Sequence, residues 1–360
     1  MANKINTFKR LVIVFGLLFS TVSAFASEST EPDTKKSEKF NAGELIIDHI
    51  TDAHEWHIAG HFAIPLPIIV YSSEKGLSAF LSSKLENGEA YKGYKIEHNH
   101  IVAVNQDGAV DEAATAKLWD ISITKNVTSM LFSVVLMLWM FISVARAYTK
   151  NVGKAPKGMQ SLLEPLIIFV RDDIAKSAIG EKKYKKYLPF LLTVFFFIWI
   201  NNLLGLIPIA PGGANVTGNI AIGLTLAAIV FIITLVSANK NYWHHILAMP
   251  GVPIGVLVLL TPIEIFGMFL KPFVLMIRLF ANMLAGHIIA LSFFSLIFIF
   301  AEMNTAVGFG VSIFSVAFTI FMGMLELLVA FLQAYVFTLL AAMYFGGATE
   351  EHHSEEIPII

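Results

Sequence analysis

The stretch "MIRLFANMLAGHIIALSFFSLIFIF", residues 276–300, decides the fold class of this chain. It is almost wholly apolar and long enough to cross a hydrocarbon core of about 30 Å as a helix. Yet Arg278 lies near its start, Asn282 one turn later and His287 near its middle. Charged groups are costly inside a bilayer, so they usually mark a polar path or a partner surface. The stretch therefore predicts a membrane helix that has a function at its polar positions.

The composition agrees with a membrane protein. Of the 360 residues, 56% are hydrophobic and 14% are charged, and the mean hydropathy is +0.69. The chain has no cysteine, which excludes disulfides and thiolate metal sites. Neither a strong charge nor a Gly-rich phosphate loop is present, so we expect no nucleic-acid partner, no cofactor and no ATP chemistry on this chain.

Residues 1–26 have the pattern of a cleavable signal peptide. Lys4, Lys9 and Arg10 precede the apolar run "LVIVFGLLF", which is too short to span a bilayer, and Ala24-Phe25-Ala26 is a small-x-small cleavage site. An uncleaved anchor is the alternative. Either way, we expect residues 27–125 to be exported to the periplasm of a bacterium.

The exported region begins with a polar stretch that we expect to be disordered. Residues 92–110, "KGYKIEHNHIVAVNQDGAV", alternate apolar and polar side chains. They predict a small hairpin that turns at Asp107-Gly108.

Residues 126–347 predict an all-α polytopic domain of about five to six membrane helices. The Lys-rich residues 147–187 mark the cytoplasmic side of an inner membrane. The apolar block 252–300 is too long for one span, so we expect a strongly tilted or in-plane helix over 252–270 and a span over 272–300. A turn over 301–310 and a returning helix over 311–345 follow. The acidic tail, 348–360, is then cytoplasmic.

A small set of polar residues falls at membrane depth in the last third of the chain. Its members are Glu264, Lys271, Arg278, Asn282, His287, Glu326 and Gln333. If the last two long segments are antiparallel, their numbering places His287 level with Glu326 and Arg278 level with Gln333. Arg278 and His287 are nine residues apart, which puts them on opposite faces and about 13 Å apart along the axis.

The chemistry of this set suits proton transfer beside a fixed charge. His and Glu exchange protons near physiological pH, whereas Arg keeps its charge and favours ionisation of a nearby carboxylate. The alternatives are a histidine that is hydrogen-bonded within the packing and a Lys271 that snorkels to the membrane surface.

Two segments resemble a known family. "PIEIFGMFLKPFVLMIRLFANMLAGH" and "LELLVAFLQAYVFTLLAAMYF" are similar to the signature segments of subunit a of F-type ATP synthases, the membrane-sector stator subunit that faces the c-ring. "NNLLGLIP" and "NVTGNIAIGL" resemble its earlier spans, so the resemblance covers residues 125–347. It implies a non-catalytic subunit whose partners are the c-ring, subunit b of the peripheral stalk and the other synthase subunits.

The resemblance also implies roles for single residues. Arg278 would face the essential carboxylate of the c-ring, with Asn282 beside it and Gln333 holding it. His287 and Glu326 would line the half-channel open to the outside, and Asn215 would lie near it. Glu264 would belong to the inner half-channel.

The exported region is longer than the family's usual N-terminal segment, and it holds a histidine cluster. His54, His57 and His61, together with His49, lie in "DHITDAHEWHIAGH". The spacing of the first three would place them on one face of a helix. We expect an amphipathic interfacial helix with Trp56; a divalent-metal site is the alternative.

Two rival functions stay open at the level of sequence. A self-contained proton-coupled antiporter would use the same Arg, His and Glu residues, but it would usually show inverted repeats, which we do not find. A membrane anchor for the exported region would not need Arg278.

Overall fold

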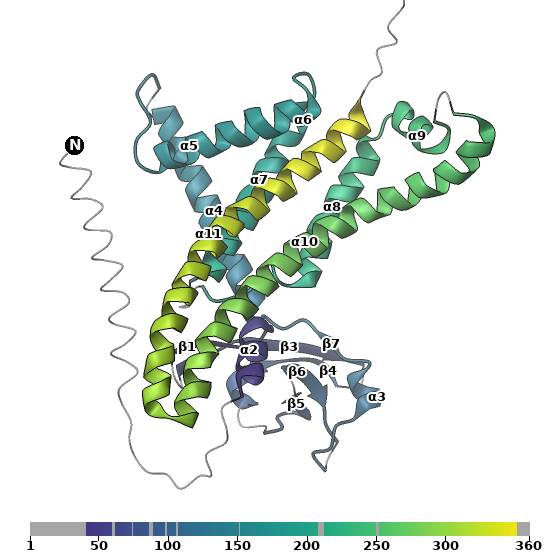
Figure 1. The fold of residues 1–360 in the computed structure, drawn as a ribbon. Coiled ribbons are helices and arrows are strands. Elements are labelled where there is room, and N and C mark those ends of the chain that lie inside the picture. Colours follow the sequence, from purple (N-terminus) through teal and green to yellow (C-terminus); the bar gives the residue numbers. More distant parts are fainter. Residues whose placement is uncertain are drawn as a thin grey trace, which may run out of the picture. The chain divides into compact units, whose positions relative to one another are not determined.

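The computed structural model describes residues 41–59, 62–73, 75–85, 89–97, 99–105, 107–150, 152–207, 212–249 and 252–350. The predicted signal peptide, the polar stretch after it and the acidic tail beyond Glu350 lie outside the described residues. Helix α2 (Ala42–Ile50) comes first, and short strands follow it (Figure 1). The strands are β1 (Glu55–Ala59), β2 (Phe62–Pro65), β3 (Pro67–Ser72), β4 (Gly76–Leu81), β5 (Tyr94–Glu97), β6 (His100–Ala103) and β7 (Trp119–Asp120).

The strands form three small antiparallel sheets in the orders β1–β2, β4–β3–β7 and β5–β6. Ile68 and Val70 on β3 pack against Tyr94 and Ile101 of the β5–β6 hairpin, and Leu85 completes this core. A short helix α3 (Glu112–Thr115) and a 3-10 turn η1 (Ser82–Lys84) connect the strands. The described residues before the first span therefore form a small α/β unit.

The predicted segment reverses at Asp107-Gly108 as expected, where Val104 pairs with Val110 in an antiparallel bridge, and it also reverses once before that point. Glu97 pairs with His100, so β5 and β6 form a tight hairpin, and Asn99 between them takes a left-handed conformation (φ 64°). Asparagine tolerates that conformation, and this is the turn signal that the prediction overlooked. Gly108 closes a separate small turn, since its N–H donates to the carbonyl of Asn105 (3.0 Å).

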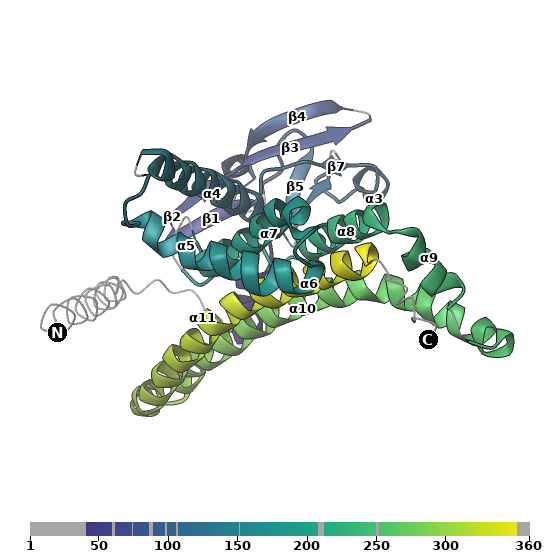
Figure 2. The same ribbon diagram turned by 90° about the horizontal axis from the view of Figure 1, so that it is seen from above.

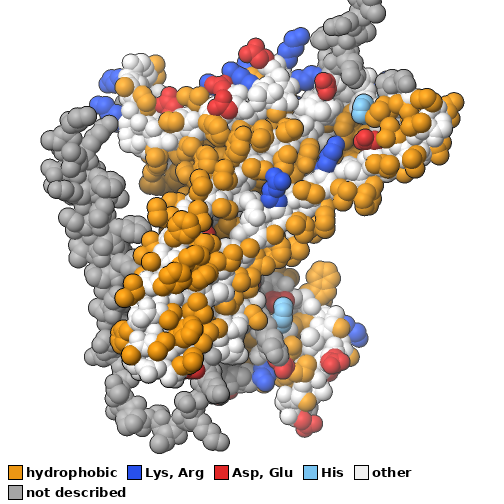
Figure 3. Space-filling model, in the orientation of Figure 1, with side chains coloured by type: hydrophobic (Ala, Val, Ile, Leu, Met, Phe, Trp, Pro, Cys, Tyr) orange, Lys and Arg blue, Asp and Glu red, His pale blue; other side chains and the backbone are white. Residues whose placement is uncertain are grey.

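Five helices of the described chain are long and apolar enough to cross a membrane, which confirms the polytopic all-α domain. They are α4 (Lys125–Lys150), α7 (Tyr184–Gly205), α8 (Ile220–Ser237), α10 (Ile254–Met303) and α11 (Thr305–Thr349). The shorter α9 (Lys240–Leu247) connects α8 to α10. Hydrophobic side chains dominate the middle of the helical part in Figure 3, and Lys and Arg side chains gather at the end that carries α5 and α6.

The basic segment between α4 and α7 is more ordered than a loop. It contains α5 (Met159–Phe169), the π-helix η3 (Val170–Lys176) and α6 (Ser177–Ile179). Val170, Ile174 and Ala175 are fully buried on one side of it. Asp172 on the other side forms ion pairs with Arg171 (2.6 Å) and Lys176 (2.9 Å). The segment is thus an amphipathic helix at the basic end of the bundle.

The prediction of a break near Lys271-Pro272 is wrong, whereas the predicted turn lies within 301–310 but is shorter than expected. Helix α10 runs without interruption for 50 residues and includes Pro262 and Pro272, and only Asn304 separates it from α11. Proline usually ends a helix in water, but membrane helices tolerate it because neighbouring helices satisfy the freed carbonyls. Asn304 caps α11 by accepting the N–H of Ala306 (2.8 Å).

The two last helices are too long to stand upright in a bilayer. At about 1.5 Å per residue, α10 is about 75 Å long and α11 about 67 Å, against a hydrocarbon core of about 30 Å. Figures 1 and 2 show the pair running obliquely past α7 and α8. The expected strongly tilted helical hairpin is therefore present, formed by α10 and α11 together.

Candidate functional site

Arg278 lies on a face of α10 that no described element covers. Its side chain is exposed, and it makes no hydrogen bond or ion pair with any described residue. Asn282, one turn later on the same face, is exposed as well. Leu275 and Leu279 are buried on the other side of the helix. Since a guanidinium at membrane depth needs a counter-charge or water, this face has room for a partner.

His287 points the other way, as the nine-residue spacing predicts. Its side chain is only 9% exposed. Its Nε2 lies 3.8 Å from the position that a Cβ on Gly205 would take, at the end of α7. The carbonyl of Ala214, in the segment that leads to α8, lies beside the same glycine. The histidine is therefore enclosed between α10, α7 and the α7–α8 connection.

Glu326 lies against α10 one residue before His287. Its Oε1 is 2.7 Å from the position that a Cβ on Gly286 would take. Because glycine has no side chain, the carboxylate occupies this space. Oε1 is buried and has no hydrogen-bond partner among the described residues. The structure thus brings a carboxylate to the level of His287, as the antiparallel numbering predicts.

Buried amides and hydroxyls that sequence reasoning missed link α7 to α11 near this point. Asn202 donates from Nδ2 to the carbonyl of Ala330 (3.2 Å), and its Oδ1 accepts from the hydroxyl of Thr217 (2.5 Å). Gln333, three residues beyond Ala330, is buried. The signal was present in "NNLLGLIP", because polar amides at membrane depth are rare. Their partners could not be known from the sequence.

Asn215 lies in the segment before α8 and is 5% exposed. Its Oδ1 accepts the N–H of Gly218 (3.0 Å), while its Nδ2 is buried without a hydrogen-bond partner in the described chain. A Cβ on Gly218 would collide with this amide, so the glycine is needed for the turn. Asn215 therefore belongs to the same end of the bundle as Asn202 and Thr217.

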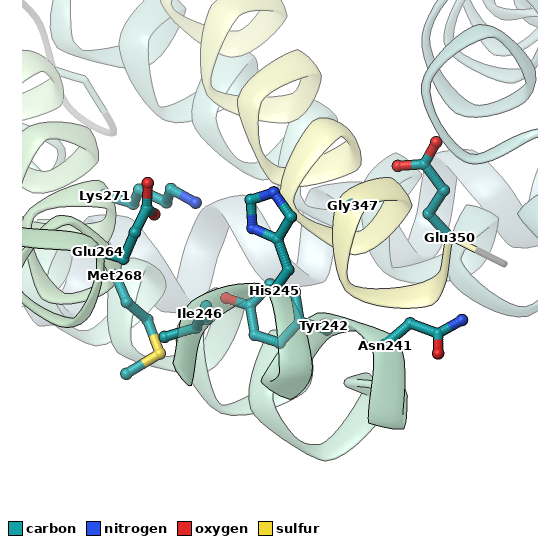
Figure 4. Close-up of a pocket in the computed structure, with 9 residues that line it drawn as sticks. All are labelled: Asn241, Tyr242, His245, Ile246, Glu264, Met268, Lys271, Gly347 and Glu350. Atoms are coloured by element: carbon teal, nitrogen blue, oxygen red, sulfur yellow. The ribbon is translucent and has the colours of Figure 1, made fainter. Parts of the chain in front are cut away.

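Glu264 is separate from this group and lines a cavity of about 220 Å³ beside α9. Figure 4 shows His245 and Tyr242 of α9 beside it, with Lys271 next to Glu264 and the end of α11 closing the other side. Burial, together with the charge of Glu264, raises the pKa of Tyr242. His245 had no signal in the sequence, since nothing there placed α9 against α10.

The predicted residues thus fall into three places. His287, Glu326 and Asn215 gather around the ends of α7 and α8, Glu264 lines the cavity beside α9, and Arg278 with Asn282 lies between them on the open face. Gln333 is buried on α11, three residues beyond the contact of Ala330 with Asn202. Along α10, Arg278 is about 21 Å from Glu264 and about 13 Å from His287. The arrangement offers two separated polar regions, with the exposed Arg278 between their levels.

The prediction of a helical histidine face in the exported region is wrong. His57 lies on strand β1, where Glu55, Trp56 and His57 pair with Pro65, Ile64 and Ala63. His61 lies outside the described residues, as do the side chains of His49 and His57. No group of side chains with a metal-binding arrangement occurs in the described part of the chain.

His54, just before β1, is buried, and its Nε2 lies 3.4 Å from Oδ2 of Asp120. Burial would raise the pKa of Asp120, but hydrogen bonds from His54 and Ser122 outweigh it and hold the pKa below its usual value. His54 therefore has a structural partner on β7.

Two family models match the chain, and the boundary between them lies where the α/β unit ends and α4 begins. Residues 127–346 match the family model described as ATP synthase A chain. Residues 45–121 match a second family model, which is described only as a domain of unknown function.

Curated relatives carry related names. The chain is 47% identical over 245 residues to "ATP synthase subunit a 2" of Chlorobaculum tepidum, a match that covers 66% of each protein. It is 42% identical to "ATP synthase subunit a" of Chloroherpeton thalassium, where 66% of this chain and 70% of the relative are covered. The protein of the same name from Myxococcus xanthus is also 42% identical, over 66% of this chain and 76% of the relative. The chain thus spans about two thirds of the length of the first of these relatives.

Proposed function

Because the chain belongs to the ATP synthase subunit a family, we propose that it is the stator that couples proton flow to rotation of the c-ring in an F-type ATP synthase. It is a multi-pass membrane protein, and ATP chemistry belongs to other subunits. Its partners are the c-ring, subunit b of the peripheral stalk and the remaining synthase subunits. It lies in a bacterial inner membrane, with residues 27–125 in the periplasm and the tail, 348–360, in the cytoplasm.

The observation that carries this proposal is the exposed Arg278. Its guanidinium lies on an apolar helix with no counter-charge in the described chain. A permanent cation at membrane depth is costly unless a second chain supplies an anion or a wet cleft. A carboxylate on each c subunit meets this need, since it is ionised beside Arg278 and protonated when it turns into lipid.

We assign the outer half-channel to the polar group around the ends of α7 and α8. Glu326 and His287 exchange protons with the outside and deliver them to the c-ring. The buried amides of Asn202, Asn215 and Gln333 keep that route polar by offering hydrogen bonds to water. We also assign to Gln333, on the neighbouring helix, the role of orienting Arg278.

We assign the inner half-channel to the cavity at Glu264. A c-ring carboxylate that has turned out of the lipid releases its proton into this cavity. Glu264 accepts the proton, which then moves to the basic end of the bundle. Arg278 lies between the levels of the two routes, so a protonated ring site cannot pass directly from one to the other. The proton therefore travels with the ring, and its electrical driving force is about 2.3 kcal/mol per charge per 100 mV.

ATP-driven proton pumping in membranes tests the proposal. Arg278→Ala should abolish pumping, and Arg278→Lys should impair it severely because an ammonium lacks the forked geometry and loses its proton more readily. Ile277→Ala, at the adjacent exposed position, is the matched control and should pump normally.

Each rival function makes a different prediction. Normal pumping by Arg278→Ala would favour a simple membrane anchor and overturn the proposal. Proton exchange by the purified chain alone in liposomes, without the c-ring, would favour an antiporter.

A further inference from the structure

The sheet β4–β3–β7 of the exported region is apolar on both faces. Its even-numbered residues Ile68 and Val70 are fully buried in the core. The odd-numbered residues of 67–71, 77–81 and 119–123 form the other face, which we name the apolar platform, and all nine are apolar. An antiparallel sheet of a soluble domain normally turns a polar face to water.

Strand pairing arranges the platform in regular rows. Tyr71 pairs with Leu77 on one side and with Trp119 on the other, so these three side chains form one row across the sheet. Ile69 pairs with Ala79 and accepts the N–H of Ile121 in the next row. The large members are open: Trp119 is 70% exposed, Leu77 68% and Ile121 59%. An exposed contiguous apolar surface of this kind marks an interaction site.

The platform faces the side from which the membrane helices rise. The β5–β6 hairpin and the core lie on the side of the sheet away from the helices (Figure 1). Figure 2, seen from the helical side, shows β3 and β4 broadside and clear of the helices. No described helix therefore fills the space over these two strands.

The unit is held in this position by bonds to the membrane helices. The indole N–H of Trp56 donates to the carbonyl of Gly212 between α7 and α8 (3.2 Å). Asp52 accepts the N–H of Asn126 in the first turn of α4 (3.0 Å), and Lys125 donates from its N–H to the carbonyl of Ala53 (2.9 Å). The last platform residue, Ile123, is two residues from the start of α4. The platform thus ends directly before a helix that is long and apolar enough to cross a membrane.

We propose that the apolar platform rests in the lipid leaflet at the end where α4 begins, so that the exported region is an interfacial membrane anchor. The platform has no charged residue, and it presents Trp119 and Tyr71, the two residue types that favour the membrane–water interface. Because the platform lies beside a membrane helix and faces the side of the helices, we infer that lipid covers it. The inference needs only the membrane spans and does not depend on proton transport.

Site-directed spin labelling of the assembled complex in lipid vesicles tests this. The chain has no native cysteine, so Leu77→Cys can carry a single nitroxide on this subunit, and Asp107→Cys, in an exposed turn after β6, is the control. The ratio of collisions with oxygen, which prefers lipid, to collisions with a water-soluble nickel chelate should be several-fold higher at position 77 than at position 107. Ala79→Cys is a smaller change on the same face, and its ratio of collisions should also be higher than that at position 107.

Two results would overturn the proposal. Equal access of the nickel chelate to positions 77 and 107 would mean that the platform faces water. Protection of position 77 from both reagents would mean that another protein, or a second copy of this chain, covers it.

Discussion

At the scale of single residues, Arg278 and His287 lie on opposite faces of α10, the first exposed and the second buried. Their nine-residue spacing predicts this arrangement. The antiparallel numbering also predicts the level of Glu326. By contrast, the bonds from Asn202 to Ala330 and Thr217 depend on how α7 packs against α11. No periodicity within one helix contains that information.

The carboxylate of Glu326 gives a prediction at this scale. Glu326→Gln removes a group that takes up and releases protons, and it leaves the volume beside Gly286 filled. We expect ATP-driven proton pumping to fall at least about tenfold. Glu302→Gln, the same change in an exposed carboxylate at the end of α10, should leave pumping unchanged. Equal rates for the two variants would remove Glu326 from the proton route.

The His54–Asp120 pair predicts a pH dependence of the exported region. The pKa of Asp120 is lower in the folded chain than its ordinary value of 3.8, so its contribution to stability is present above that value and is lost as the pH falls through the folded pKa. The carboxylate is partly exposed, so the effect should stay below about 1 kcal/mol. Hydrogen exchange of β7 should therefore be faster in Asp120→Asn than in the unchanged chain at pH 7. A difference that persists undiminished below pH 3 would contradict this origin.

At the scale of elements, the number of spans could be predicted, but their limits could not. Pro262, Pro272 and the short Asn304 connection misled the prediction because local rules for helix ends come from chains in water. In a membrane, unsatisfied backbone groups are so costly that α10 continues through both prolines. The prediction of a histidine-bearing helix in the α/β unit was also wrong. The spacing of the histidines fits a helix, but pairing with β2 makes the segment around His57 a strand.

Close packing between α11 and α6 predicts which glycine is structural. A Cβ on Gly346 would collide with the backbone carbonyl of Ala178, whereas nothing lies near a Cβ on Gly323 in the same helix. Gly346→Ala should therefore lower thermal stability, with a free-energy cost of about 1–3 kcal/mol. Gly323→Ala should be neutral or slightly stabilising, because alanine favours helix. Similar melting temperatures for both variants would show that α6 moves aside.

At the scale of the whole molecule, the exposed surfaces say more about function than the core does. Among the surfaces of the described chain that lack protein cover are the Arg278–Asn282 face of α10 and the apolar platform. The first could be predicted from an arginine in an apolar segment. The second could not, because strand β7 is only two residues long and its register with β3 depends on contacts across about 50 residues of sequence. We assign the first face to the c-ring and the second to the lipid leaflet.

The central claim is that the Arg278–Asn282 face lies opposite the ion-binding carboxylate of the c-ring. Disulfide cross-linking tests this claim most directly. The chain has no cysteine of its own, so Asn282→Cys can be combined with a cysteine placed one helical turn from that carboxylate in the c subunit. Oxidation should link the two chains, whereas Val135→Cys, which is exposed on α4, should give no link. A result in which Asn282→Cys stays unlinked, or in which Val135→Cys links equally well, would contradict the account.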